Sequence, residues 1–108
     1  MIELDRKIFT LCKPKGISDL GDGLWDVSDA VRRKWSPSER WEDLEPEIRK
    51  ACIKRGVRFS VIFFGEDGDD ADWRADHDAC EHDFGGRTAC EAAALALIAL
   101  KESEAKNE

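Results

Sequence analysis

The segment that most constrains the fold is an alanine-rich stretch near the C-terminus, in which residues 89–103 are mostly Ala, Leu and Ile. Thr88-Ala89-Cys90-Glu91 opens it as a capping box, where the Thr and Glu side chains satisfy free N–H groups at a helix N-terminus. Apolar residues occupy more than one stripe of the predicted helix, which is typical of a helix buried on most sides. This helix must therefore pack on a sheet and also contact a further element.

Three segments between residues 57 and 84 show the alternation of side chains that is typical of β-strands. They are residues 57–64, residues 71–77 and a shorter strand through Cys80, His82 and Phe84. Trp73 and Ala75 are predicted to point inward from the second strand, and Gly85-Gly86 is predicted to end the third. Strands joined by such short connections indicate an antiparallel sheet.

The N-terminal third is predicted to contain a helix, a loop and a short stretch of strand. The helix has an apolar face at helical spacing, formed by Leu4, Ile8, Leu11 and Cys12. Residues 13–16 are predicted to end it, and residues 16–24, rich in Gly and Asp, are predicted to be a loop. Residues 25–35 are predicted to hold one or two short strands.

A middle helix is predicted from a local N-terminal signal. Ser36 suits the N-cap, Pro37 suits the first helical position, and Glu39 completes a capping box. Pro46 falls inside the predicted helix and indicates a kink or a later start. Gly56 is a typical C-terminal stop.

A chain of 108 residues fits one domain with a single hydrophobic core. With 42% apolar and 38% charged residues, its composition is that of a globular protein. We predict a single α+β domain over residues 1–103 and a solvated tail over residues 104–108. Its antiparallel sheet of three to four strands is expected to be layered with helices on both faces, in the order α-β-α-β-β-β-α.

The net charge of −7 is concentrated in residues 66–83, which carry nine acidic side chains and one basic one. Two interpretations stay open: a solvated edge that discourages aggregation, and a binding face for a basic protein surface. Direct binding of nucleic acid is disfavoured because phosphates would be repelled, and the acidic turn does not fit a calcium-binding EF-hand loop. The candidate binding residues are Glu66, Asp67, Asp69, Asp70, Asp72, Asp76 and Asp78.

One cluster of residues has metal-ligand chemistry. His77, Cys80, His82 and Cys90 carry donor atoms for a tetrahedral zinc site, without the paired spacings of zinc knuckles. Packing explains the same residues equally well, since Cys80 and His82 would share a strand face and Cys90 suits a buried helix face. Cys90 near a helix N-terminus is also the candidate for a reactive thiol, which burial would suppress. We predict no enzymatic activity and no cofactor.

The cysteines and the N-terminal residues bear on the compartment. The four cysteines are even in number, as two disulfides would require. Residues 1–12 mix charged with apolar side chains, however, and lack the apolar core of a signal peptide. The longest apolar run, residues 92–100, is far shorter than the about 20 residues of a membrane span. We expect a cytoplasmic protein with free thiols and no membrane contact.

Four motifs make the chain resemble the phage ABA sandwich family of small bacteriophage and prophage proteins. They are Trp35-Ser36-Pro37-Ser38 opening a helix, Arg58-Phe59-Ser60-Val61 on a strand, Trp73-Arg74-Ala75 on the next strand, and Thr88-Ala89-Cys90-Glu91-Ala92-Ala93-Ala94-Leu95 opening the last helix. The resemblance covers roughly residues 25–101, and the chain departs from it in the long acidic hairpin and at residues 41–43. It implies an antiparallel sheet layered with helices, and it carries over no catalytic residue.

The resemblance and the acidic block together lead to an expected function: a small phage or prophage accessory protein that binds and inhibits a host protein with a basic surface. Its sharpest form is an inhibitor of CRISPR or another nucleic-acid-based defence, with an acidic surface that mimics nucleic acid, in the cytoplasm of the bacterial host. Two alternatives stay open. One is a structural or regulatory phage protein that self-associates through an exposed Trp41 or Phe64, and the other is a zinc-stabilised binding module. The chain is expected to be a monomer or a homodimer.

Overall fold

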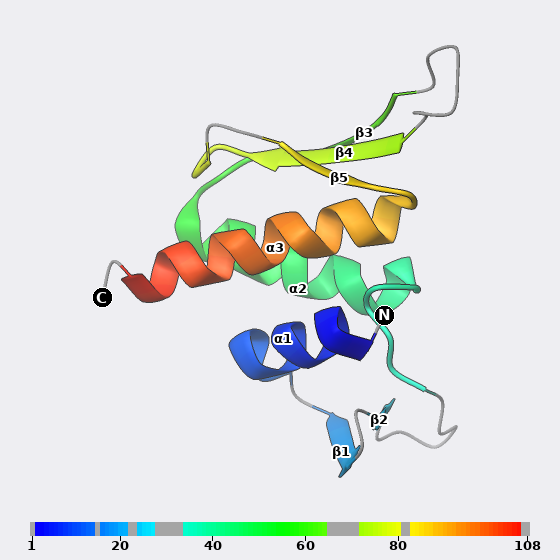
Figure 1. Cartoon of the computed structure of the whole chain (residues 1–108). Helices are drawn as coiled ribbons and strands as arrows, with labels where there is room; N and C mark the ends of the chain where they lie inside the picture. The colour runs from blue at the N-terminus through cyan, green and yellow to red at the C-terminus, as the bar shows by residue number, and fades with distance from the viewer. Residues whose placement is uncertain are drawn as a thin grey trace.

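Helices and strands alternate along the chain in a computed structural model, which describes residues 2–14, 16–21, 24–27, 34–64, 72–80 and 83–106 (Figure 1). The elements are α1 (Ile2–Cys12), β1 (Ile17–Gly21), β2 (Leu24–Val27), α2 (Trp41–Arg55), β3 (Phe59–Phe64), β4 (Asp72–His77), β5 (Phe84–Gly86) and α3 (Ala89–Lys106). The predicted α+β class is confirmed, and the order of the elements is roughly the predicted one. None of the helices in these ranges has both the length and the apolar character that crossing a membrane requires.

The main sheet is antiparallel, with β4 between β3 and β5. Along β3 and β4, Phe59 lies opposite His77 and Val61 lies opposite Ala75, and the pairing runs without a bulge. Ala75 is buried and Trp73 packs against the core. The first two predicted strands and the inward direction of these two side chains are therefore confirmed.

The third strand differs from its prediction. β5 begins at Phe84 and includes Gly85 and Gly86, while Cys80 lies before it. Gly86 lies within the strand where α3 passes close to it: a Cβ atom on Gly86 would lie 2.6 Å from the backbone nitrogen of Ala92. A glycine in a strand often marks such a close approach of another backbone. The prediction that the glycines end the strand was wrong, because at Gly86 the missing side chain makes room for α3 and does not break the strand.

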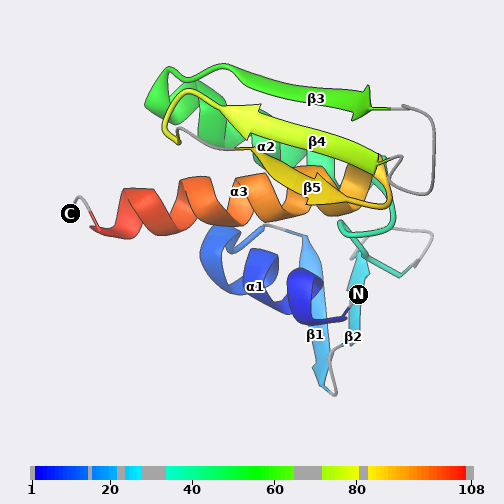
Figure 2. The same ribbon diagram turned by 45° about the horizontal axis from the view of Figure 1, so that its top comes forward.

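All three helices lie on one face of the main sheet (Figure 1, Figure 2). The opposite face carries exposed residues, among them Ser60, Asp76 and Gly85. The expected layering of sheet and helices is confirmed, but for the described residues the expectation of helices on both faces was wrong. The reason is that α1 and α2 pack on α3, so the apolar sides of α3 that face away from the sheet are already covered.

The last helix, α3, forms the centre of the core. Its buried residues include Ala92, Ala93, Ala94, Ala96, Leu97, Ile98 and Leu100. The backbone N–H of Glu91 donates to Oγ1 of Thr88 at 3.0 Å, as the predicted cap requires, and the Glu91 carboxylate accepts from the N–H of Arg87 at 3.3 Å. Burial on most sides is confirmed, and the helix runs past its predicted end to Lys106.

The first two strands form a small antiparallel hairpin where a loop was predicted for residues 16–24. Ile17, at the start of β1, packs against the core. The pairing shifts register between Asp19 and Gly21. Such an irregularity interrupts the side-chain alternation on which strand prediction depends, so the loop prediction was wrong. β2 overlaps the start of the region, residues 25–35, that was predicted to hold one or two short strands, and residues 28–33 lie outside the described residues.

The middle helix starts later than predicted. α2 begins at Trp41, whereas Ser36 starts a turn in which its carbonyl accepts the N–H of Glu39 at 3.1 Å. The Ser36 hydroxyl donates to the carboxylate of Asp5 on α1 at 2.9 Å. The same hydroxyl lies 3.2 Å from a carboxylate oxygen of Glu39. The prediction that Ser36 caps α2 was wrong, because its hydroxyl donates to carboxylates whereas an N-cap must accept a backbone N–H, and the helix begins only at Trp41. Gly56, with φ of 67°, ends α2 as predicted.

A buried polar network joins α1 to the turn that precedes α2. Asp5, Ser36, Ser38 and Asp43 are all buried. Besides the Ser36 hydroxyl, Asp5 accepts the N–H of Ser38 at 2.8 Å, and Asp43 accepts the N–H of Ser36 at 2.9 Å. Hydrogen bonds to ionised carboxylates are stronger than those between neutral groups. The network therefore fixes the path by which the chain enters α2.

Candidate functional site

The predicted acidic binding residues fall only partly within the described residues. Asp72 is the first residue of β4, and Asp76 and Asp78 are exposed on β4 and in the turn after it. Glu66, Asp67, Asp69 and Asp70 lie outside the described residues. Basic side chains lie among the described acids, since Arg74 forms an ion pair with Asp83 at 3.7 Å. The acidic-surface hypothesis stays a prediction, and the described outer face of the sheet has mixed charge.

One of the two histidines of the predicted metal set, His77, is part of the core. His77 is buried, and its ring lies between those of Phe59 and Phe84, with centroids at 5.9 and 6.3 Å. Its Nε2 lies 3.0 Å from the carbonyl oxygen of Ala96, and its Nδ1 has no hydrogen-bond partner among the described residues. Burial lowers the pKa of His77, so the neutral ring is favoured and Nε2–H donates to the carbonyl.

The other described members of that set are Cys80 and Cys90. Cys80 is half-buried, Cys90 is buried on α3, and His82 lies outside the described residues. Within the described ranges, no three His, Cys, Asp or Glu side chains are grouped as a metal ion would require. Burial raises the pKa of the Cys90 thiol, which disfavours a reactive thiolate. The four-residue zinc hypothesis stays a prediction.

A groove lies between α2 and β3. Its volume is about 430 Å³, and its lining residues are Trp41, Glu45, Ile48, Arg49, Cys52, Phe59 and Val61. The first five follow one stripe of α2 at helical spacing, and the last two alternate on β3. Trp41 remains 45% exposed although it is a large aromatic side chain. The groove is therefore apolar at its base and open to solvent.

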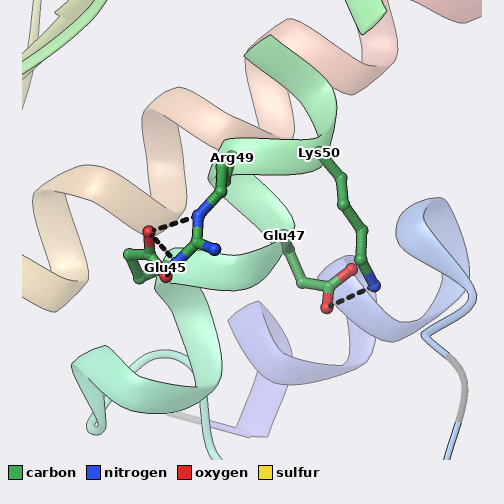
Figure 3. Close-up of polar contacts among 4 residues, drawn as sticks. All are labelled: Glu45, Glu47, Arg49 and Lys50. Atoms are coloured by element: carbon green, nitrogen blue, oxygen red, sulfur yellow. Dashed lines mark hydrogen bonds and ion pairs between the residues drawn. The ribbon is translucent and has the colours of Figure 1, made fainter. Parts of the chain in front are cut away.

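Charged side chains on α2 border the groove. Glu45 and Arg49 are one helical turn apart, and the carboxylate accepts from Nε and Nη2 of the guanidinium at 2.8 and 2.6 Å (Figure 3). Glu47 and Lys50 form a second, looser pair at 3.7 Å (Figure 3). Glu47 is buried, and burial raises its pKa. The pair nearer the groove neutralises itself, so the groove presents apolar surface with little net charge.

β3 is an edge strand of the described sheet: it pairs with β4 on one side, and no described strand lies on its other side. The N–H of Asp78 donates to the carbonyl of Arg58 at 3.2 Å. This bond shows which residues of β3 turn their backbone N–H and C=O groups toward β4, because that direction alternates from one residue to the next. Even-numbered residues of β3 thus direct their backbone groups toward β4. Phe59, Val61 and Phe63 direct theirs toward the free edge, and their side chains lie on the groove side.

The row of groove-side residues on β3 ends in an exposed aromatic pair. Phe63 is 55% exposed, and its ring centroid lies 5.1 Å from that of Trp73 on β4. The sequence predicted an exposed anchor at Trp41 or Phe64. Trp41 is exposed, the Phe64 side chain lies outside what the structure describes, and the anchor role stays a prediction. The exposure of Phe63 was not predicted. No local signal distinguishes Phe63 from the more covered Phe59 and Val61. Phe63 is exposed because α2 does not cover that end of the sheet, and only the tertiary packing decides which end is covered.

Comparison with known proteins identifies no relative. No protein-family model, curated protein or solved structure matches the chain. The resemblance to the phage ABA sandwich family therefore stays a prediction, and the groove is interpreted from its own geometry.

Proposed function

We propose that this chain is a protein-binding module that holds an apolar segment of a partner protein in the groove between α2 and β3. The observation that carries the proposal is the open apolar wall beside the half-exposed Trp41. Aromatic side chains, Trp above all, are the usual anchors of protein interfaces. A contiguous exposed apolar surface on a small charged protein is typical of an interaction site.

The groove suits binding better than catalysis. Its titratable lining residues are Glu45, Arg49 and Cys52. The first two are paired with each other, and burial raises the pKa of the Cys52 thiol. A nucleophile needs the opposite shift or a neighbouring base. These side chains therefore favour holding a ligand over transforming one.

The biological form that we propose is a small phage or prophage accessory protein that binds and inhibits a host protein. Support comes from the family resemblance and from the acidic block in residues 66–83, which attracts basic surfaces over long range. An inhibitor of CRISPR or another nucleic-acid-based defence is its sharpest version, because defence proteins that hold nucleic acid present cationic grooves. The apolar groove then supplies short-range contacts, and the acidic block supplies attraction.

The test is a pull-down from a bacterial lysate with the tagged protein and two matched variants. Trp41→Ala removes the anchor, whereas Ile53→Ala removes a side chain of the same helix that is 75% exposed and does not line the groove. Partner capture should survive in Ile53→Ala and fall by about ten-fold or more in Trp41→Ala. Equal capture by both variants would falsify binding through the groove. A third variant, with Asp67, Asp69, Asp70 and Asp72 changed to Asn, should weaken capture mainly at low salt.

A further inference from the structure

We infer that the free edge of β3 pairs with the β3 strand of a second copy of this chain, antiparallel about a two-fold axis at Val61. This inference rests on the proposed function, since it uses the same face of the molecule, and it adds the identity of a partner. The groove would then be completed by the added strand of the second copy.

The backbone of β3 is prepared for such pairing. Phe59, Val61 and Phe63 direct their N–H and C=O groups away from β4, as the hydrogen bond between Asp78 and Arg58 establishes. With the axis at Val61, each Phe59 faces a Phe63 of the other copy and Val61 faces itself. All three pairs are then of the hydrogen-bonded kind, which provides about six hydrogen bonds across the axis.

The side chains along this edge are self-complementary, as a two-fold interface requires. Phe59 and Phe63 flank Val61 symmetrically on the groove side of the strand. Each Phe59 would lie opposite a Phe63, and aromatic cross-strand pairs stabilise antiparallel sheets. The Phe63 side chain of the second copy would project beside Phe59 toward the groove, where it would cover apolar surface that is open in the single chain.

The edge lacks the features by which sheets of monomeric proteins avoid pairing. Natural edge strands carry Lys, Pro, a bulge or an inward charge. The strand reads FSVIFF, which contains neither a charge nor a proline, in a chain that is 38% charged. Its pairing with β4 runs through six consecutive partners without a shift. The edge strand is therefore uncharged, and it is regular along its whole length.

The symmetry of the strand favours a second copy as the occupant, in spite of the net charge of −7. Along β3 the groove-side residues Phe59, Val61 and Phe63 read the same in both directions, and the strand carries no charged side chain that would repel its own copy. A second copy therefore matches this edge residue for residue, as an interface about a two-fold axis requires.

Sedimentation velocity of the full chain over a range of concentrations tests the inference, with two variants on the same strand. Phe63→Lys places a charge in the paired row, and Ile62→Lys places it on the opposite face at nearly equal exposure, 55% against 53%. The wild-type chain should show a monomer–dimer equilibrium. Phe63→Lys should weaken dimerisation by about ten-fold or more, and Ile62→Lys by much less. Circular dichroism checks that both variants are folded.

A cross-linking experiment tests the register. The two-fold axis at Val61 places Ser60 opposite Ile62 of the second copy in a close, non-hydrogen-bonded pair, which is within disulfide reach. A mixture of Ser60→Cys and Ile62→Cys chains should form a covalent dimer on mild oxidation. Either variant alone should form no more than the wild-type chain, whose own cysteines set the baseline.

Three results would overturn the inference. They are a monomer at every accessible concentration, a dimer indifferent to Phe63→Lys, and cross-linking of Ser60→Cys chains with themselves. A monomer that still captures a lysate protein through Trp41 would leave the proposed function standing and remove only the self-pairing. A dimer that captures no other protein would support the self-pairing and count against the proposed inhibitor.

Discussion

The helices α2 and α3 cover the same face of the sheet, and yet they meet it in different ways. α3 presents alanines to the strands and comes so close that Gly86 must lack a side chain. α2 presents Trp41, Glu45 and Arg49 on the side facing β3, and a groove remains between them. The difference teaches that side-chain size sets the distance between layers. Small residues produce the sealed half of this protein, and large or charged ones produce the half available for binding.

The largest effect should come from cavity formation in the sealed half. Leu97→Ala on α3 removes a fully buried side chain and should cost about 3 kcal/mol of unfolding free energy, because its neighbours enclose the vacated space. Ile48 on α2 lines the open groove. Ile48→Ala should therefore cost about 1 kcal/mol less unfolding free energy than the same change at an enclosed site, because neighbouring side chains and solvent can fill the space. Urea denaturation of both variants measures the difference. Equal losses would show that the two helices are packed alike.

An added atom at the contact between α3 and β5 should cost almost as much unfolding free energy as the lost Leu97 side chain. Gly86→Ala sets a Cβ atom against the backbone of Ala92 and should cost about 2 kcal/mol, because neither backbone moves freely. Gly85→Ala is the matched control, since Gly85 is exposed on the outer face of the same strand. Its unfolding free energy should stay within about 1 kcal/mol of the wild type. Similar losses in the two variants would contradict the close approach of α3.

His77 should make the sealed half sensitive to acid. Its pKa is lowered in the folded state, mainly by burial, so below pH 6.5 the unfolded chain binds more protons than the folded one. Stability should therefore be level above neutral pH and fall as the pH drops through 6.5. His77→Phe retains the ring stack and should remove this slope, which thermal melts at a series of pH values would detect. His82→Gln, which changes the other histidine, should keep this dependence of stability on pH. If the His82→Gln variant loses it and the His77→Phe variant keeps it, the dependence belongs to His82 and not to His77.

The smallest effects should distinguish the two glutamates of α2 that form ion pairs. Burial raises the pKa of Glu47, so the folded state favours its protonated form and stability falls as the pH rises through its titration. Glu47→Gln should thus raise the unfolding free energy at neutral pH by a few tenths of a kcal/mol, because the exposed Lys50 stays solvated. Glu45→Gln should lower it by about 0.3–0.5 kcal/mol through loss of the exposed pair with Arg49. Chemical denaturation at pH 7 compares the signs, and changes of the same sign would refute the contrast.

Much of the fold was predictable because its signals are local. The Thr88 cap, the buried alanine-rich helix, the alternation along β3 and β4 and the stop at Gly56 each depend on residues within a few positions of one another. The candidate site was predictable only at Trp41. The Ser36 signal failed because its hydroxyl donates to Asp5, 31 residues away, instead of accepting an N–H of the helix. The prediction for Gly86 failed because its close neighbour, Ala92, lies on another element.

What the sequence by itself determined is the set of periodic elements, the α+β class and the acidic block at residues 66–83. Periodicity and composition are properties of neighbouring residues, so the sequence shows them directly. Only the tertiary structure decided that the helices gather on one face, that β3 is an edge, and that α2 stands off from it to leave a groove. Those features depend on the distances at which side chains of different size let helices and sheet pack, and such distances exist only once the chain is folded.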